Sequence, residues 1–311
     1  MIDYYSSRTY YDAHLQPVWR ALPPEARGEV LTPDSDLVAR PRLTLVGSAG
    51  DLKKVRLAGR RAVLLNHGVG MSYGTGHFGF SGASDREGAA LLLNPNWYAD
   101  AADAAGNPQV PRAVVGCPKL DPWWDRPAAP SRRPIVVISF HWPGMQEMPE
   151  TRWAFPHYRP ALHHLKETLH RVGYEAYGHS HPLAARRLGS FWRRQRMPFL
   201  QEFDDVLRQA SLYVVDNSST AYEFAATGRP VLLMNAPWYR RDVDFGLRFW
   251  RHLPGLQVDE PEDLIARIVE ALHDSEVVRS TRRAAVLEAY PVGHNGTASR
   301  LAAQAILEVM Q

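Results

Sequence analysis

The chain has 311 residues, 45% of them hydrophobic, and a formal net charge of +3, which is the composition of a globular protein long enough for two domains. Its single cysteine, Cys117, excludes an internal disulfide and a cysteine-rich metal site. The mild positive charge favours an anionic ligand without predicting wholesale nucleic-acid binding. Neither a bilayer-spanning apolar run nor a secretion signal is found, so we expect a cytoplasmic protein and leave peripheral membrane association open.

Short apolar strands alternate with helical stretches along the chain, which indicates an α/β fold with parallel sheets covered by helices. In the first half we predict strands at Ile2–Tyr5, Leu43–Val46, Ala62–Leu65, Ala89–Leu93 and Arg112–Val115, and helices at Tyr10–Leu22 and Asp51–Leu57. In the second half we predict strands at Ile135–Phe140, Tyr174–Gly178, Leu212–Val215 and Val231–Met234, and helices at His157–Arg171, Pro261–His273 and Asn295–Met310.

The segment Pro122–Pro134 contains four prolines, which cannot lie inside regular elements, so it reads as a linker. We therefore predict one Rossmann-like domain over 1–125 and a second over 126–294. A C-terminal helix over 295–311 is expected to pack back on the first domain. Two such domains imply a central cleft, with ligands bound beyond the carboxyl ends of the strands.

The most informative stretch follows the strand Leu212–Val215, where polar residues lead into a helix that ends at Gly228. Helix-start amides have no partner inside the helix and carry positive partial charge, so hydroxyl groups gathered there suit a phosphate. The alternative is that these residues only cap the helix. The hydroxyl residues are Ser218, Ser219 and Thr220, and Glu223 lies one helical turn further on. Together with the preceding Asp216 and Asn217 they are the candidate donor-binding residues of this segment.

His67 follows the strand Ala62–Leu65 and precedes a glycine-rich loop that includes Gly68 and Gly70. Glycines keep side chains away from whatever approaches the imidazole, and a histidine at a strand end can take a proton from an attacking hydroxyl. His77 is a weaker candidate on the same loop, and 68–82 is a candidate lid. The alternative for His67 is a structural histidine bonded to the loop backbone.

Two further strand ends carry polar side chains. His181, next to His179, precedes a proline that favours an extended or turn geometry, so its side chain can project towards a phosphate. Ser139 and His141 mark the end of the strand Ile135–Phe140 and are candidate donor ligands. The alternative for the histidines of 179–181 is polar surface, and a pair of them alone makes a weak metal site, so we predict no metal.

Two charged segments carry less information. The run Phe191–Arg196 could contact a polyanion, but a solvated face with buried aromatics is the more common explanation. Asp242 and Asp244 resemble a metal-binding aspartate pair, yet they lie among arginines, so ion pairing is the simpler interpretation.

Taken together, the His67–Gly68 loop, the Gly116–Asp121 junction, the His181–Pro182 pair and the segment 216–231 resemble the CDP-glycerol glycerophosphotransferase family, which contains teichoic-acid primases and polymerases. The resemblance implies a GT-B fold, with two facing Rossmann-like domains and an active site between them. It also implies that His67 is the general base, that His181 assists the donor diphosphate, that 218–220 hold phosphate and that Glu223 binds ribose hydroxyls. The first sixty residues do not match, and His141-Trp142 replaces the proline-threonine usual in that family.

We therefore predict a metal-independent transferase without a cofactor. It would move a glycosyl or glycerophosphate group from a nucleotide-diphosphate donor, bound by the second domain, to an acceptor hydroxyl held by the first. CDP-glycerol and a nucleotide sugar both stay open as donors. A polyol phosphate, a glycan, a lipid-linked molecule and a nucleic acid stay open as acceptors. The rival readings are a nucleotide-sugar 2-epimerase and a non-catalytic nucleotide or polyanion binder.

Overall fold

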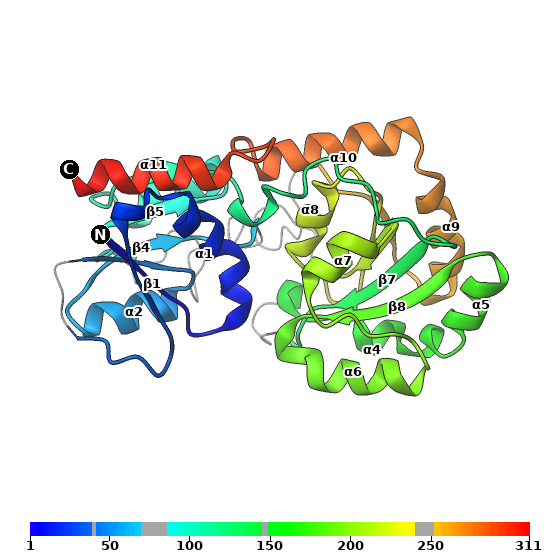
Figure 1. The fold of residues 1–311 in the computed structure, drawn as a ribbon. Coiled ribbons are helices and arrows are strands. Elements are labelled where there is room, and N and C mark those ends of the chain that lie inside the picture. The colour runs from blue at the N-terminus through cyan, green and yellow to red at the C-terminus, as the bar shows by residue number, and fades with distance from the viewer. Residues whose placement is uncertain (39–41, 70–85, 145–148, 240–251) are drawn as a thin grey trace. The chain divides into compact units, whose positions relative to one another are not determined.

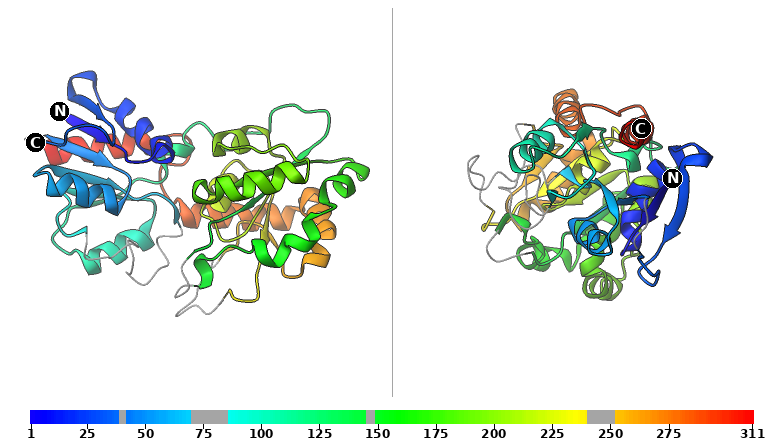
Figure 2. Two further views of the ribbon diagram at one scale, coloured as in Figure 1. Left: turned by 90° about the horizontal axis from the view of Figure 1, so that it is seen from below. Right: turned by 90° about the vertical axis from the view of Figure 1, so that its left-hand side faces the viewer.

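The computed structural model describes residues 1–38, 42–69, 86–144, 149–239 and 252–311 (Figure 1). The chain divides into two compact units, one made of 1–124 with 287–311 and the other of 125–286. Both chain ends belong to the first unit (Figure 2). Candidate residues Gly70 and His77 and the discounted pair Asp242 and Asp244 lie outside the described residues, as does most of the candidate lid.

Unit 1 is built on a six-stranded sheet in the order β2-β1-β3-β4-β5-β6, in which every pairing is parallel. Its strands are β1 (Ile2–Tyr5), β2 (Arg27–Leu31), β3 (Leu43–Val46), β4 (Arg61–Leu65), β5 (Leu91–Asn94) and β6 (Arg112–Val114). Its helices are α1 (Thr9–Ala21), α2 (Ala49–Leu57), α3 (Trp97–Gly106) and α11 (Ala298–Met310).

Helices cover both faces of the unit 1 sheet because its strands are apolar on both sides. On one face Leu45 shares a cluster with Leu15 of α1 and Ile306 of α11. On the other face Val46 packs with Leu52 of α2. Figure 1 shows α11 running beside α1, so the last residues of the chain complete the core begun by the first.

Unit 2 is built on a five-stranded parallel sheet in the order β11-β10-β9-β7-β8. Its strands are β7 (Ile135–Phe140), β8 (Glu175–Ser180), β9 (Leu212–Val215), β10 (Val231–Met234) and β11 (Leu256–Val258). Its helices are α4 (Phe155–Tyr158), α5 (Leu165–Arg171), α6 (Ala185–Arg194), α7 (Phe203–Gln209), α8 (Thr220–Ala225) and α9 (Leu264–His273). The prediction of two α/β domains with parallel sheets is thus confirmed.

The structure differs from the predicted elements where local signals were weak. The helix expected over His157–Arg171 is broken into α4, a 3-10 turn at Arg159–Leu162 and α5, with Pro160 inside that turn. The run Phe191–Arg196 largely belongs to α6, where Trp192 is fully buried while the neighbouring Arg193 is exposed. The run is therefore a solvated helix face with buried aromatic side chains, which is the more common of the two explanations.

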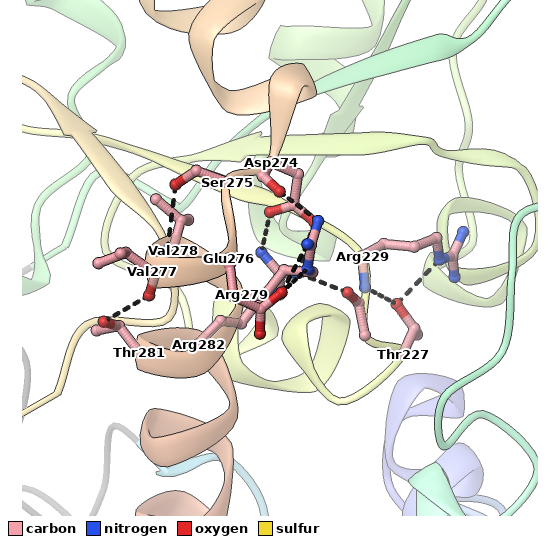
Figure 3. A network of polar contacts seen from close by, with 11 residues as sticks. Thr227, Arg229, Asp274, Ser275, Glu276, Val277, Val278, Arg279, Thr281 and Arg282 are labelled. Atoms are coloured by element: carbon pink, nitrogen blue, oxygen red, sulfur yellow. Dashed lines mark hydrogen bonds and ion pairs between the residues drawn. The ribbon is translucent and has the colours of Figure 1, made fainter.

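A long helix, α10 (Glu276–Ala289), continues across the division of the chain at 286/287. Its first half is fastened within unit 2 by Arg282, whose guanidinium pairs with the Asp274 carboxylate at 2.7 Å and donates to the Gly228 carbonyl at 2.7 Å (Figure 3). Asp274 has a φ of 46° and ends α9 in the left-handed conformation. These contacts tie the start of α10 to the turn that follows α8.

Candidate functional site

Most of the predicted donor residues lie together at the carboxyl ends of adjacent strands of unit 2. Ser139 is the penultimate residue of β7, His141 follows the strand, and His181 follows β8, which pairs with β7 in register. The segment between β9 and α8 holds the rest of the set, which is Asp216, Asn217, Ser218 and Ser219, with Thr220 and Glu223 on α8 itself. Because β7 lies between β8 and β9, the three loops share one edge of the sheet.

Asp216 organises the loops around this edge. Its carboxylate is completely buried and accepts the backbone N–H of His141 at 2.8 Å on one oxygen and that of Ala154 at 2.8 Å on the other. A charged acceptor shared by two backbone amides is a strong local constraint. The Asp216 side chain therefore fixes the two ends of the segment that connects β7 to α4.

A chain of hydroxyl groups runs from the buried strand β9 to the start of α8. Thr220 Oγ1 donates to Ser218 Oγ at 2.7 Å and lies 3.0 Å from the hydroxyl of Tyr213. Since Thr220 has one hydroxyl hydrogen and uses it on Ser218, Tyr213 must be the donor in the other bond. Burial raises the pKa of Tyr213, which keeps its hydroxyl protonated and able to donate.

Ser218 is the last member of this hydroxyl chain. Its Oγ accepts both the Thr220 hydroxyl and the Thr220 backbone N–H, the latter at 3.3 Å, so its own hydrogen is available to a ligand. No acceptor for that hydrogen occurs in the part of the chain that the structure describes. Aligned hydrogen bonds polarise one another, which makes Ser218 a better donor to an oxyanion than an isolated serine.

Helix α8 itself contributes less than its sequence suggests. It has only six residues, and the side chain of its N-cap residue, Ser219, makes no capping hydrogen bond. The short helix gives a small dipole, so the hydroxyl chain is the main feature here that favours an anion. Beside it, the side-chain amide of Asn217 is buried without a hydrogen-bond partner in the described ranges, and Glu223 is 3% exposed on α8.

The two histidines after β7 and β8 are in contact, with ring centroids 4.9 Å apart and planes at 65°. His141 Nδ1 donates to the Thr151 carbonyl at 3.1 Å, and His181 Nδ1 accepts the Leu183 N–H at 3.1 Å. Burial lowers the pKa of His141 to about 4, a shift that its bond to Thr151 only partly opposes. His141 is therefore a neutral imidazole near pH 7.

The remaining candidates, His67 and Gly68, belong to unit 1. The His67 ring packs against two side chains of α1, Tyr11 at 4.7 Å and His14 at 5.4 Å between ring centroids. Gly68 has a φ of 78°, a conformation that favours glycine, so the loop turns immediately after the imidazole. Burial lowers the pKa of His14 well below its usual range, with smaller contributions from the charges of Lys119 and His67.

A buried polar network precedes His67, and sequence reasoning missed it. The Asn66 amide at the end of β4 donates to the side chain of Asn94 and, at 3.1 Å, to the carboxylate of Asp103 on α3. Arg86 pairs with the same carboxylate at 3.0 Å. The sequence signal for this network is a polar residue at the end of each of two apolar strands: Asn66 directly after β4, and Asn94 as the last residue of β5.

Two general features of the described chain complete the picture. No group of three or more histidine, cysteine or acidic side chains placed to hold a metal ion occurs within the described ranges. None of the helices described is both long enough and apolar enough to span a bilayer.

Several solved structures have a similar fold over nearly the whole chain. A variant of the wall teichoic acid polymerase TagF soaked with CDPG is 12% identical, with a TM-score of 0.68, covering 99% of this chain and 88% of that one. A Listeria monocytogenes protein described as a UDP-N-acetylglucosamine 2-epimerase is 14% identical, with a TM-score of 0.62 over 100% of this chain and 96% of its own. S. aureus MnaA in complex with UDP is 12% identical, with a TM-score of 0.57 over 96% and 93%. At such identities the likeness establishes the GT-B fold.

The sequence matches a family model over part of its length. Residues 166–308 match the model of the CDP-Glycerol:Poly(glycerophosphate) glycerophosphotransferase family, and this range includes the hydroxyl chain and His181. The resemblance predicted from the sequence is confirmed over these residues, and it indicates an enzyme of the glycerophosphotransferase type. No curated protein matches it in sequence.

Proposed function

We propose that the chain transfers the glycerophosphate group of CDP-glycerol to an acceptor hydroxyl, with the donor bound at the carboxyl edge of the unit 2 sheet. The observation that supports this most is the hydroxyl chain Tyr213–Thr220–Ser218, which presents an O–H in a segment that the family model covers. The Ser218 hydrogen donates to a phosphate oxygen of the donor. A nucleotide sugar is the alternative donor for the same site.

The other unit 2 groups have complementary tasks in this proposal. Because the Leu183 N–H occupies Nδ1 of His181, the neutral ring carries its hydrogen on Nε2 and donates it to the diphosphate. The buried amide of Asn217 gains a partner when the donor binds. Glu223 accepts hydrogen bonds from the ribose hydroxyls, and Asp216 holds the His141 loop in place.

The chemistry requires a base for the acceptor, and His67 is the candidate. The acceptor oxygen attacks the phosphorus that bears glycerol, His67 takes the hydroxyl proton, the bond to the bridging oxygen breaks, and CMP leaves. Donated hydrogen bonds from Ser218 and His181 offset the negative charge that grows on the leaving phosphate. The reaction needs no redox partner, because one phosphorus–oxygen bond forms while another breaks.

A comparison of donors tests the proposal. We expect CDP-glycerol to raise the melting temperature more than UDP-, GDP- or TDP-linked donors, because a ligand that prefers the native state stabilises it. CMP release should then require both CDP-glycerol and a polyol-phosphate acceptor. Conversion of UDP-N-acetylglucosamine by the protein alone, without any acceptor, would instead establish the 2-epimerase reading. Salt-dependent nucleic-acid binding without donor turnover would establish a non-catalytic binder.

A further inference from the structure

His141 stands where the resembling family usually has a proline-threonine pair, and three contacts fix its position. Its backbone N–H donates to Asp216 at 2.8 Å, and its ring Nδ1 donates to the Thr151 carbonyl at 3.1 Å. Its ring also meets that of His181 edge to face, with 4.9 Å between centroids. A residue held by one backbone contact and two ring contacts is preorganised to present its remaining polar atom in one direction.

That remaining atom is Nε2, and it is a hydrogen-bond acceptor. A carbonyl oxygen only accepts, so the bond to Thr151 places the ring hydrogen of His141 on Nδ1. Burial, which lowers the pKa of His141 to about 4, keeps Nε2 unprotonated near pH 7. Within the described ranges Nε2 has no hydrogen-bond partner.

The neighbouring ring has the opposite character. A backbone N–H only donates, so the bond from Leu183 leaves Nδ1 of His181 without hydrogen and places it on Nε2. Two imidazoles in contact therefore offer one acceptor and one donor. Phosphate oxygens of an ionised diphosphate accept but do not donate, so they suit His181 and cannot satisfy His141.

We propose that His141 is a specificity-determining residue whose Nε2 accepts a hydrogen bond from a hydroxyl of the donor, next to the phosphate that His181 contacts. This inference rests on the proposed donor site. A donor hydroxyl has two sources, the transferred polyol and the ribose, and both present the same O–H. A ligand that bears only phosphate near His141 covers this acceptor without satisfying it and binds less tightly.

Two substitutions separate the role of Nε2 of His141 as a hydrogen-bond acceptor from the structural role of its bond to Thr151. In His141→Asn the amide N–H replaces Nδ1 and keeps the bond to Thr151, but no acceptor remains at the Nε2 position. In His141→Gln the longer side chain places a carbonyl oxygen near that position. His164→Asn is the control, because His164 is a surface histidine of the same unit whose side chain is 86% exposed.

Affinities are measured by calorimetry on the full chain with CDP-glycerol, CDP and the 2′,3′-dideoxy form of CDP. We expect His141→Asn to weaken CDP-glycerol binding about tenfold, with substantial recovery in His141→Gln and no change in His164→Asn. If the polyol supplies the hydroxyl, CDP keeps its affinity. If the ribose does, CDP weakens as well, while the dideoxy form is unaffected in either case. An equal loss for all three ligands, or no loss for any, overturns the proposal.

A second measurement does not depend on the donor. Long-range proton–nitrogen NMR of the wild-type imidazole should show hydrogen on Nδ1 of His141 and a shift of the Nε2 signal when glycerol or ribose is added. Hydrogen on Nε2 in the free protein would refute the inference even if CDP-glycerol binds. Conversely, the expected tautomer together with a failure of every nucleotide to bind would refute the proposed function and leave His141 as a hydroxyl acceptor for another ligand.

Discussion

Replacement of Asp216 by asparagine should destabilise unit 2 and weaken donor binding together. Each carboxylate oxygen accepts one backbone N–H, from His141 and from Ala154, both at 2.8 Å. The side-chain oxygen of asparagine still accepts one of these N–H groups, but in a neutral bond. Its NH₂ group faces the other backbone N–H, so two hydrogen-bond donors oppose each other there. Two charge-assisted bonds worth about 1.5–3 kcal/mol each are lost and one neutral bond of about 1 kcal/mol stays, so the expected destabilisation is about 2–5 kcal/mol.

Urea unfolding measures this difference directly, provided that both proteins show the same dependence on denaturant. Asp204→Asn is the matched control, since Asp204 is exposed on α7 and its substitution should stay within about 0.5 kcal/mol. CDP-glycerol affinity should fall in Asp216→Asn because the His141 loop loses its anchor. A stability within about 0.5 kcal/mol of the wild type would refute the reasoning, because it would mean that the two amides are satisfied without the carboxylate.

Three further predictions address other parts of the site. His67→Ala should lower kcat by about two to four powers of ten while donor affinity stays constant, as stopped-time assays of CMP release and calorimetry would show; near-normal turnover would remove His67 as the base. Tyr213→Phe should cost about 1 kcal/mol of unfolding free energy and weaken donor binding, since Thr220 loses its hydrogen-bond donor; unchanged affinity would mean that the hydroxyl chain does not serve the ligand. The pKa of His141 is lowered to about 4 from 6.5, so between these pH values the unfolded chain holds a proton that the native chain lacks, and native stability falls as pH drops through this window. The unfolding free energy of His141→Asn should lack this pH-dependent loss. Measured by urea unfolding, it should rise by about 2–3 kcal/mol relative to that of the wild type between pH 7.5 and pH 4; the same pH dependence in both proteins would contradict the lowered pKa.

The fold could be predicted because its signals are local. Strands such as Leu212–Val215 are continuous apolar runs, and turn residues separate them from helices. The edge strand β2 was missed because Arg27–Leu31 is largely polar and exposed, and α10 because its exposed, charged sequence carries few buried positions. The break at Pro160 shows that a proline can interrupt a helix even where the surrounding sequence has a helical pattern.

The site could be predicted in its membership but not in its hydrogen bonding. The sequence places Ser218 and Thr220 after a strand, yet which hydroxyl donates depends on Tyr213, seven residues before Thr220 and on a buried strand. The tautomer of His141 likewise depends on a carbonyl ten residues away in the chain. Which atom donates in these hydrogen bonds depends on tertiary contacts, so a local sequence pattern cannot predict it.

Unit 1 is built from two stretches of chain that flank unit 2, and this order affects its synthesis. Ile306 and Ala302 of α11 fill the core of unit 1 beside Leu15 and Val18 of α1, near the opposite terminus. Translation proceeds from the N-terminus, so the strands and helices of 1–124 leave the ribosome before α11 does, and the interior of unit 1 closes only after unit 2 has been made. Unit 2, encoded by an uninterrupted stretch, has every segment it needs much sooner. A nascent chain stalled before α11 should therefore present an exposed apolar groove on α1 and the adjoining strands, the kind of surface that chaperones recognise.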